Sequence, residues 1–450
     1  MKKSIFTKSL LASALALSAT YANAAAFQLA EISTSGLGRA YAGEAAIAED
    51  ASVVATNPAL MTKFKQNEFS VGSVLVNAKV DLDGKAALFN PRYNPQSAPS
   101  AQNSPFLAQD IPAKQHDVVP RAFVPNLYVV TPINDRFALG GGMNVNFGMQ
   151  SKFDSDYSAG IYGGTTKLTA INLNLSGAYR IIDGLSFGFG VNSVYAKAKL
   201  ERNAGIAEKI LDGKVSAALR RPVDAADEET IVSRLQDKAW GFGWNAGLVY
   251  EFNENNRIGL AYHSHVDIKF KDDKAYKFNY PNAIENPASL KLNLPAYWEI
   301  SGYHKMTDKF AMSYSVKRTL WSRFKELHAV YDNGTEALHK PEHFQDSTRI
   351  ALGASYDVNE ALTLRAGIAY DESPIVAPYK SASIPDTDRT WYSLGATYKF
   401  TSNLSVDLAY THIKGKTANF VEFEKDKGLK VEYTSKSKAN LFGLNLNYRF

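Results

Sequence analysis

Few residues in this sequence have the type and spacing that catalysis or metal binding would need. His263 and His265 would share one face of a strand and could offer two ligands to a metal, but no third ligand is evident. Ser264 lies between them and would point to the opposite face, so neither histidine could activate it as a nucleophile. No other combination of Ser, His and an acid stands out. We therefore expect no catalytic residue, no metal site and no enzymatic activity.

A glycine-rich stretch near the N-terminus, Gly36-x-Gly38 followed by Gly43, also falls short of a cofactor site. No strand precedes it, and the third glycine is misplaced for a dinucleotide-binding loop. The sequence has no cysteine, which excludes disulfides and thiol chemistry. The net charge of +5 is nearly balanced and does not indicate nucleic-acid binding. We expect no cofactor and no nucleic-acid partner.

The clearest structural signal is the alternation of residue types from Trp240 to Phe270. Large apolar residues occupy every second position on both sides of a polar turn at Asn253–Asn256. Period two places the alternate residues on opposite faces of a sheet. Each half is longer than an ordinary strand and can cross a bilayer at a tilt. We expect one apolar face to meet lipid along both halves: Trp240, Phe242, Trp244, Leu248, Tyr250 and Phe252, then Ile258, Leu260, Tyr262, Val266, Ile268 and Phe270.

Segments of this kind recur along the chain. Tight turns alternate with long connections, the asymmetry typical of outer-membrane barrels, and the last residue is the aromatic Phe450. The pattern predicts an all-β fold, a 14-stranded antiparallel transmembrane β-barrel over 67–450, in the outer membrane of a Gram-negative bacterium. Its strands are expected near 68–82, 121–131, 136–150, 165–181, 184–200, 238–252, 256–270, 289–304, 308–322, 346–358, 361–372, 387–400, 403–416 and 437–450.

Two segments precede the predicted barrel. Residues 1–24 have the basic start, apolar centre and Ala-Asn-Ala end of a secretory signal, and the apolar run is too short to span a bilayer. Residues 25–66 are rich in small residues and keep neither a helical nor a strand period for long. Because a wide barrel leaves room in its lumen, we expect this segment to form an N-terminal hatch, or plug, inside the barrel.

Two long connections differ from the others. Residues 83–120 are rich in Pro, Ala, Asn and Gln, which suggests an irregular cap. Residues 204–237 have good helix formers, with apolar residues at helical spacing in two places: Ile206, Ile210 and Leu211, then Ile231, Val232 and Leu235. Exposed amphipathic helices need an apolar surface to cover. That surface could be neighbouring loops, which the sequence alone favours, or an apolar ligand.

Several stretches of the chain form recognisable motifs: Phe27-Gln28-Leu29, Ser35 to Tyr41, Gly43-Glu44, Asn57 to Leu60, Gly163 to Thr166, Asn172 to Arg180, Trp240 to Gly247 and Ser383 to Asp386. In this order they resemble the FadL family, the outer-membrane long-chain fatty acid transporters, over essentially the whole chain after the signal sequence. The departures lie in the two long connections, which in the family help to form the access groove for the ligand.

The resemblance implies a role for two cations that would otherwise be ordinary solvated loop charges. Arg202, at the end of KAKLER, and Lys340, in ALHKPEHF, match the positions that coordinate the fatty acid carboxylate. The chemistry is reasonable, because a carboxylate that enters an apolar cavity needs a cation to offset its desolvation.

The resemblance also implies a lateral opening in the wall. The third expected strand is rich in glycine, which tolerates bulges, although glycine could equally fit a crowded wall. In the family this strand is kinked inward, and the matching positions here are Asn146, Phe147 and Gly148, with Gly247 nearby. Gating residues are assigned on the same ground. They are Phe27, where the hatch end closes over the ligand, and the motif Asn57, Pro58 and Ala59.

These inferences predict an outer-membrane transporter that takes up long-chain fatty acids by ligand-gated passive diffusion, with exit through the gap in the third strand. We expect its partners to be fatty acids or similar hydrophobic ligands, outer-membrane lipid and lipopolysaccharide, and we expect a monomer. Three alternatives remain open: uptake of monoaromatic hydrocarbons, as in a sister branch of the family, a general aqueous porin, and an outer-membrane lipid hydrolase.

Overall fold

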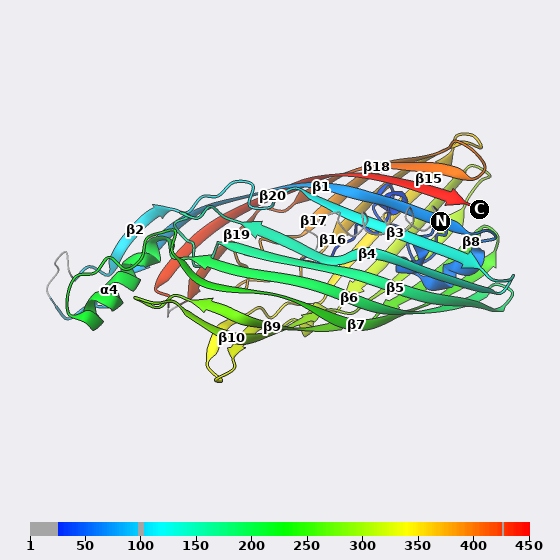
Figure 1. Cartoon of the computed structure of the whole chain (residues 1–450). Coiled ribbons are helices and arrows are strands. Elements are labelled where there is room, and N and C mark those ends of the chain that lie inside the picture. Colours follow the sequence, from blue (N-terminus) through cyan, green and yellow to red (C-terminus); the bar gives the residue numbers. More distant parts are fainter. Residues whose placement is uncertain (1–25, 98–102, 425–426) are drawn as a thin grey trace, which may run out of the picture.

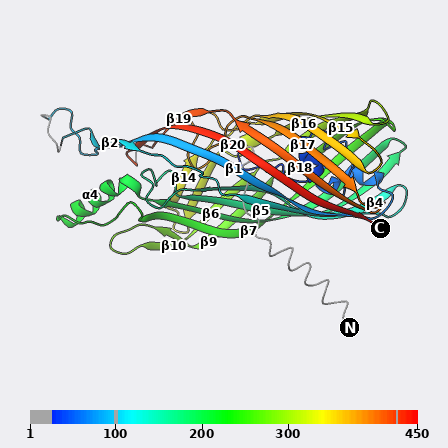
Figure 2. The same cartoon turned by 90° about the horizontal axis from the view of Figure 1, so that it is seen from above.

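The computed structural model describes residues 26–97, 103–424 and 427–450 (Figures 1 and 2). The predicted signal sequence at 1–24 lies outside the described residues. Helix α4 (Glu208–Leu219) and strand β2 (Phe106–Pro112) project beyond one end of the molecule in both views, and the C-terminus lies at the other end. Long loops mark the extracellular end of an outer-membrane barrel, so the end with α4 faces outward from the cell.

The predicted 14-stranded barrel is confirmed. Over the described residues the wall has fourteen antiparallel spans, two of which are interrupted once, and β1 closes the sheet by pairing with β20. The spans in order are β1 (Glu68–Phe89), β3 (Ala122–Pro132), β4 (Phe137–Lys152), β5 (Thr165–Ile182), β6 (Leu185–Asn203), β7 (Ile231–Asn253), β8 with β9 (Asn256–His263 and Val266–Lys277), β10 with β11 (Ile284–Leu294 and Tyr297–Lys305), β12 (Phe310–Thr319), β15 (Ser347–Asp357), β16 (Leu362–Asp371), β17 (Arg389–Lys399), β18 (Leu404–Gly415) and β20 (Leu429–Arg449).

Shorter elements extend the wall at the extracellular end. They are β2, β13 (Glu326–Tyr331), β14 (Glu336–Pro341) and β19 (Ala418–Glu424), with the short helices η2 (Gly205–Ala207) and η3 (Trp321–Arg323). The predicted irregular cap at 83–120 is wrong in part, because β1 continues to Phe89 and pairs there with β2. Among the described residues, no helix is both long enough and apolar enough to cross a membrane.

The 204–237 connection holds one of the two predicted helices. Its first half is η2 and α4, as expected. The second helix is wrong, because β7 begins at Ile231 and pairs with β6 along its whole extracellular extension, up to Asn203. Ile231 and Val232 are β-branched and fit a strand well, and pairing with a long neighbouring strand overrides an apolar spacing that helix and strand can share.

The lower barrel, between the short turns and the level of Trp244, is apolar outside and polar inside. Leu248 and Tyr250 on the outer face of β7 are 40% and 47% exposed. The lumen side of the neighbouring spans carries buried amides that bond to one another: Asn172, Asn174, Asn192 and Asn245. This distribution suits a wall with lipid outside and a polar plug inside.

The two faces exchange roles above this level. Ile258 and Leu260 of β8 lie on the outer surface, 36% and 42% exposed, whereas Ile268 and Phe270 of β9 are buried inside the barrel. The prediction that one apolar face meets lipid all the way from Ile258 to Phe270 is therefore wrong beyond Ser264.

An irregularity of the backbone causes the exchange. Ser264-His265 separates β8 from β9, and Pro295-Ala296 interrupts the neighbouring span at the same height, between the pairs His263↔Tyr297 and Val266↔Leu294. A shift of one residue in a strand moves every later side chain to the other face. Since both spans shift together, they remain paired while their apolar side chains turn from the lipid to the interior.

Most of residues 26–64 are buried inside the barrel, largely in its lower part (Figure 1, dark blue). This segment forms α2 (Thr34–Leu37), α3 (Val53–Thr56) and η1 (Pro58–Lys63), joined by turns. Arg39 forms ion pairs with Glu44 (3.0 Å) and with Glu49, and Glu49 also pairs with Arg365 of β16 (3.2 Å). Polar contacts of this kind fix the orientation of the segment relative to the wall.

Candidate ligand-binding site and wall opening

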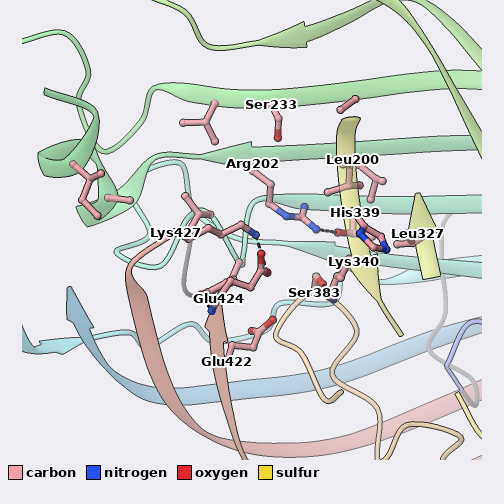
Figure 3. A pocket seen from close by; sticks show the side chains of 18 of the residues that line it. Leu200, Arg202, Ser233, Leu327, His339, Lys340, Ser383, Glu422, Glu424 and Lys427 are labelled. Atoms are coloured by element: carbon pink, nitrogen blue, oxygen red, sulfur yellow. Dashed lines mark hydrogen bonds and ion pairs between the residues drawn. The ribbon is translucent and has the colours of Figure 1, made fainter. Parts of the chain in front are cut away.

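A cavity of about 290 Å³ lies in the extracellular part of the barrel, between α4, β6, β14 and β19 (Figure 3). Both cations singled out in the sequence, Arg202 and Lys340, line it. Its remaining surface is largely apolar and includes Leu200, Ile210, Leu211, Val232, Leu327 and Ile384. The apolar residues of α4 thus cover a cavity as well as neighbouring loops.

Arg202 stands near the end of β6, seven residues beyond Tyr195, whose ring packs on Trp240 at the outer rim of the apolar band. Its guanidinium donates to the carbonyl oxygens of Thr165 (3.2 Å) and Glu201 (2.9 Å) and to Thr166 Oγ1 (3.0 Å). These acceptors are neutral, and no ion pair to Arg202 occurs within the described part of the chain. Burial lowers the pKa of Arg202 to about 10, against the effect of nearby acids, so the group stays charged at neutral pH.

Lys340 reaches the cavity from β14 and is already partnered. Its ammonium donates to Ser381 Oγ (2.8 Å) and Ser383 Oγ (3.2 Å) and lies 3.2 Å from a carboxylate oxygen of Glu342. The Glu342 side chain has no exposed surface. Burial raises the pKa of Glu342, although Lys340 opposes the shift.

Sequence reasoning missed the acids and the third cation of this site. Glu422 and Glu424 come from β19, and Lys427 follows it; Glu424 and Lys427 form an ion pair of 2.8 Å. These residues lie far along the chain from Arg202 and Lys340, on a loop with no distinctive motif. The alternation FVEFE over 420–424 could have indicated a further strand there, but not which loop it would face.

A narrower apolar cavity of about 40 Å³ continues from the main one toward the hatch. Leu200, Leu327 and Ile384 belong to both, and the smaller cavity ends at Phe27. The ring of Phe27 is packed in an aromatic cluster, with ring centroids 4.6 Å from Trp321, 5.3 Å from Phe324, 6.2 Å from Phe147 and 6.4 Å from Phe344.

The wall is broken on the other side of Phe27. The ladder between β3 and β4 ends at Leu127↔Met143, and β4 has an irregularity between Val145 and Phe147. Beyond this point the N-terminal segment pairs with β4 in place of β3. Leu29 N–H donates to Asn146 O (2.9 Å), and Gly148 N–H donates to Phe27 O (2.8 Å). The structure thus brings Phe27 together with Asn146, Phe147 and Gly148.

Gly247 and the Asn57-Pro58-Ala59 motif lie elsewhere. Asn57 Nδ2 donates to the carbonyl oxygens of Ala45 (2.7 Å) and Leu248 (3.1 Å), and its Oδ1 accepts from Ala59 N–H (3.0 Å). Pro58 begins η1 directly after this cap. A Cβ at Gly247 would overlap the Asn57 amide, so this glycine makes room for the hatch. Gly247 is three spans from β4, opposite Gly188 and not beside the break.

The two histidines considered as metal ligands do not share a face. His263 is buried, stacks on Tyr297 with ring centroids 4.3 Å apart, and hydrogen-bonds Ala55 O through Nε2 (2.9 Å). His265 follows the register shift and is exposed. The expectation that both lie on the lumen face is wrong, for the same reason as that for Ile268 and Phe270.

The family described as "Outer membrane protein transport protein (OMPP1/FadL/TodX)" matches residues 15–450. Outer membrane protein P1 of Haemophilus influenzae is 54% identical, and the long-chain fatty acid transport protein of Escherichia coli strain K12 is 40% identical; both alignments cover 100% of each chain.

Among solved structures, a FadL homologue of Pseudomonas aeruginosa has a TM-score of 0.78 at 24% identity, covering 94% of this chain and 99% of that one. The toluene transporter TodX of Pseudomonas putida has a TM-score of 0.63 at 17% identity, covering 95% and 100%. These likenesses concern the fold. The family matches residues 15–450, and two relatives aligned over their full length are 54% and 40% identical. This outer-membrane chain therefore belongs to the OMPP1/FadL/TodX family of transporters for hydrophobic compounds.

Proposed function

We propose that this protein takes up long-chain fatty acids from outside the cell. The observation that carries the proposal is Arg202, a cation at the edge of an apolar cavity whose hydrogen bonds in the described chain all go to neutral acceptors. A ligand carboxylate is the counter-ion that this arrangement lacks. Lys340 would supply a second donor by exchanging one of its serine partners for the ligand.

The tail of the ligand would occupy the apolar passage that leads from the main cavity to Phe27. About 15 methylenes at roughly 0.8 kcal/mol each would contribute on the order of 12 kcal/mol before the cost of association. The two cations would then fix the orientation of the ligand more than they set its affinity. A neutral aromatic hydrocarbon would form no ion pair with these two cations, so their presence favours an acid as the ligand.

Release would be lateral, through the break between β3 and β4. Phe27 separates the apolar passage from this break, so displacement of residues 27–29 from β4 would connect the two. Such a displacement needs only local hydrogen bonds and aromatic contacts to be exchanged. Transport would be diffusive and gated by the ligand.

Removal of both cations tests the proposal. We expect Arg202→Ala to weaken binding of hexadecanoate by about tenfold or more, because a charge-assisted hydrogen bond is worth about 1.5–3 kcal/mol, and the double variant with Lys340→Ala to lose most uptake. Lys197→Ala is the matched control, because this lysine lies on the outer face of the same strand. Binding is measured by equilibrium titration and uptake in cells. Normal uptake by the double variant would exclude this site.

The alternatives give different results in the same assays. A transporter of aromatic hydrocarbons would bind the methyl ester or toluene as well as the acid. A general porin would conduct ions strongly in planar bilayers, and a hydrolase would release fatty acid from phospholipid.

A further inference from the structure

Glu422 differs from the other acids of the binding site. Glu342 pairs with Lys340, and Glu424 pairs with Lys427. Glu422 is 8% exposed and lines the cavity, yet in the described structure it forms no ion pair. Its contact is with the Ala382 N–H, which donates to Oε2 (2.9 Å). Figure 3 shows its carboxyl group below Ser383, in the same pocket as Lys340 and Arg202.

The groups that face Glu422 come from every side of the cavity. The titratable and charged residues are Lys340 and His339 on β14, Glu342 after it, Arg202 on β6, Lys214 on α4, Glu424 and Lys427 on or after β19, and the phenols of Tyr157, Tyr162 and Tyr433. Of the cations, Lys340 has the strongest effect on Glu422, and it is shared with Glu342.

A ligand carboxylate at Arg202 and Lys340 would be a fourth carboxylate beside Glu342, Glu422 and Glu424. Like charges close together in a cavity shielded from water cannot all remain ionised, and the acid with the weakest pairing accepts the proton. A protonated carboxyl group can also donate a hydrogen bond, which a ligand carboxylate or a water bound to it can accept.

We propose that Glu422 is a further ligand-binding residue. Its carboxylate takes up one proton from solvent when an anionic head group enters, and the protonated Glu422 carboxyl then holds that head group. This inference rests on the proposed function. It makes binding of an anion depend on proton uptake by the protein as well as on the charge of the anion.

The electrostatics of the free protein agree with this role. Glu422 lies on an extracellular extension of the wall, outside the membrane-spanning band. Burial raises the pKa of its carboxyl to about 7, although Lys340 opposes the shift. Ligand binding favours the protonated form, so affinity is full below this pKa and falls as the pH rises above it.

The test is binding of hexadecanoate and of hexadecane sulfonate to the detergent-solubilised, full-length mature protein between about pH 6.5 and about pH 8.5. The sulfonate stays ionised throughout, so any proton must come to the protein. We expect affinity for both to fall by up to about tenfold per pH unit above about pH 7.5. In Glu422→Gln the slope should disappear, and the variant should bind more tightly than the wild type at the highest pH.

Two control variants and one comparison separate Glu422 from its neighbours. Glu424→Gln removes a paired acid from the same strand, and His339→Gln removes the histidine that lines the same cavity; both should keep the slope. Burial lowers the pKa of Lys427, and loss of its charge would also weaken binding at high pH. That pH dependence, unlike the one caused by Glu422, would persist in Glu422→Gln.

Calorimetry of the unmodified protein at about pH 8, where the free Glu422 carboxyl is mostly ionised, should show uptake of close to one proton per ligand in buffers of different ionisation enthalpy. This measurement needs no variant to fold. A wild-type affinity that does not change with pH, or an unchanged slope in Glu422→Gln, would overturn this inference and leave the proposed function standing. Absence of binding at any pH would instead overturn the proposed function.

Discussion

The lower and upper parts of this barrel are built from the same alternating sequence but are opposite in polarity. Below Ser264 the apolar side chains of β8 meet lipid and the lumen is polar. Above it the apolar side chains of β9 are buried inside the barrel, where Phe270 lines the apolar passage, and charged residues such as Lys269 face outward. The exchange needs only one irregularity in each of two paired spans. Period two therefore gives the alternation of a strand, but the environment of each face depends on backbone register at the membrane boundary.

The largest expected effect on stability comes from replacing isoleucine on the two sides of the register shift at Ser264. Ile268→Ala should destabilise the protein by about 2–5 kcal/mol, because the side chain is fully buried and its loss leaves a cavity. Ile258→Ala should cost about 1 kcal/mol, because lipid tails fill the space it leaves. Urea unfolding of both variants in lipid bilayers measures the difference. Equal losses would mean that the two faces do not differ in environment.

A charge placed on the outer face of the lower barrel should have the next largest effect. Leu260→Arg should cost about 2–4 kcal/mol, since the side chain projects into hydrocarbon. Ser289→Arg, at a neutral, exposed position on the outer face of β10 above the boundary, is the control and should stay within about 0.5 kcal/mol of the wild type. A similar cost at both positions, measured by the same unfolding assay, would place the membrane boundary higher than the register shift.

A smaller effect is expected where the lower lumen receives the hatch. Gly247→Ala should cost about 1–3 kcal/mol, because its Cβ would overlap the Asn57 amide and displace the hatch. Ion conductance in planar bilayers should rise with this displacement. Gly177→Ala, where the nearest atom to the new Cβ is 3.6 Å away, should leave conductance and stability unchanged. If both variants conduct alike, Asn57 does not anchor the hatch.

Much of the wall could be predicted from the sequence, because long alternating segments and tight turns are local features. The spans from β15 to β18 differ from their predicted bounds by at most two residues. The register shifts could not be predicted, since Ser264-His265 continues the alternation and nothing marks an extra residue. The helical spacing of Ile231, Val232 and Leu235 was misleading because pairing with β6 decides the structure there.

The binding site was only partly predictable. Arg202 and Lys340 were identified by resemblance and do line one cavity, but Glu422 and Glu342 depend on loops that meet only in three dimensions. Gly247 was assigned to the lateral opening because its motif is shared with the family, whereas its structural partner is Asn57. A close approach of a glycine to a distant side chain leaves no trace in a single sequence.

The pairing of residues 27–29 with β4 puts one short segment both at the end of the apolar passage and in the wall of the barrel. In the proposed mechanism, emptying of the passage toward Phe27 and sideways opening of the wall would therefore be a single movement, since both would require these hydrogen bonds to break. The ligand would then leave its site and the barrel in the same step.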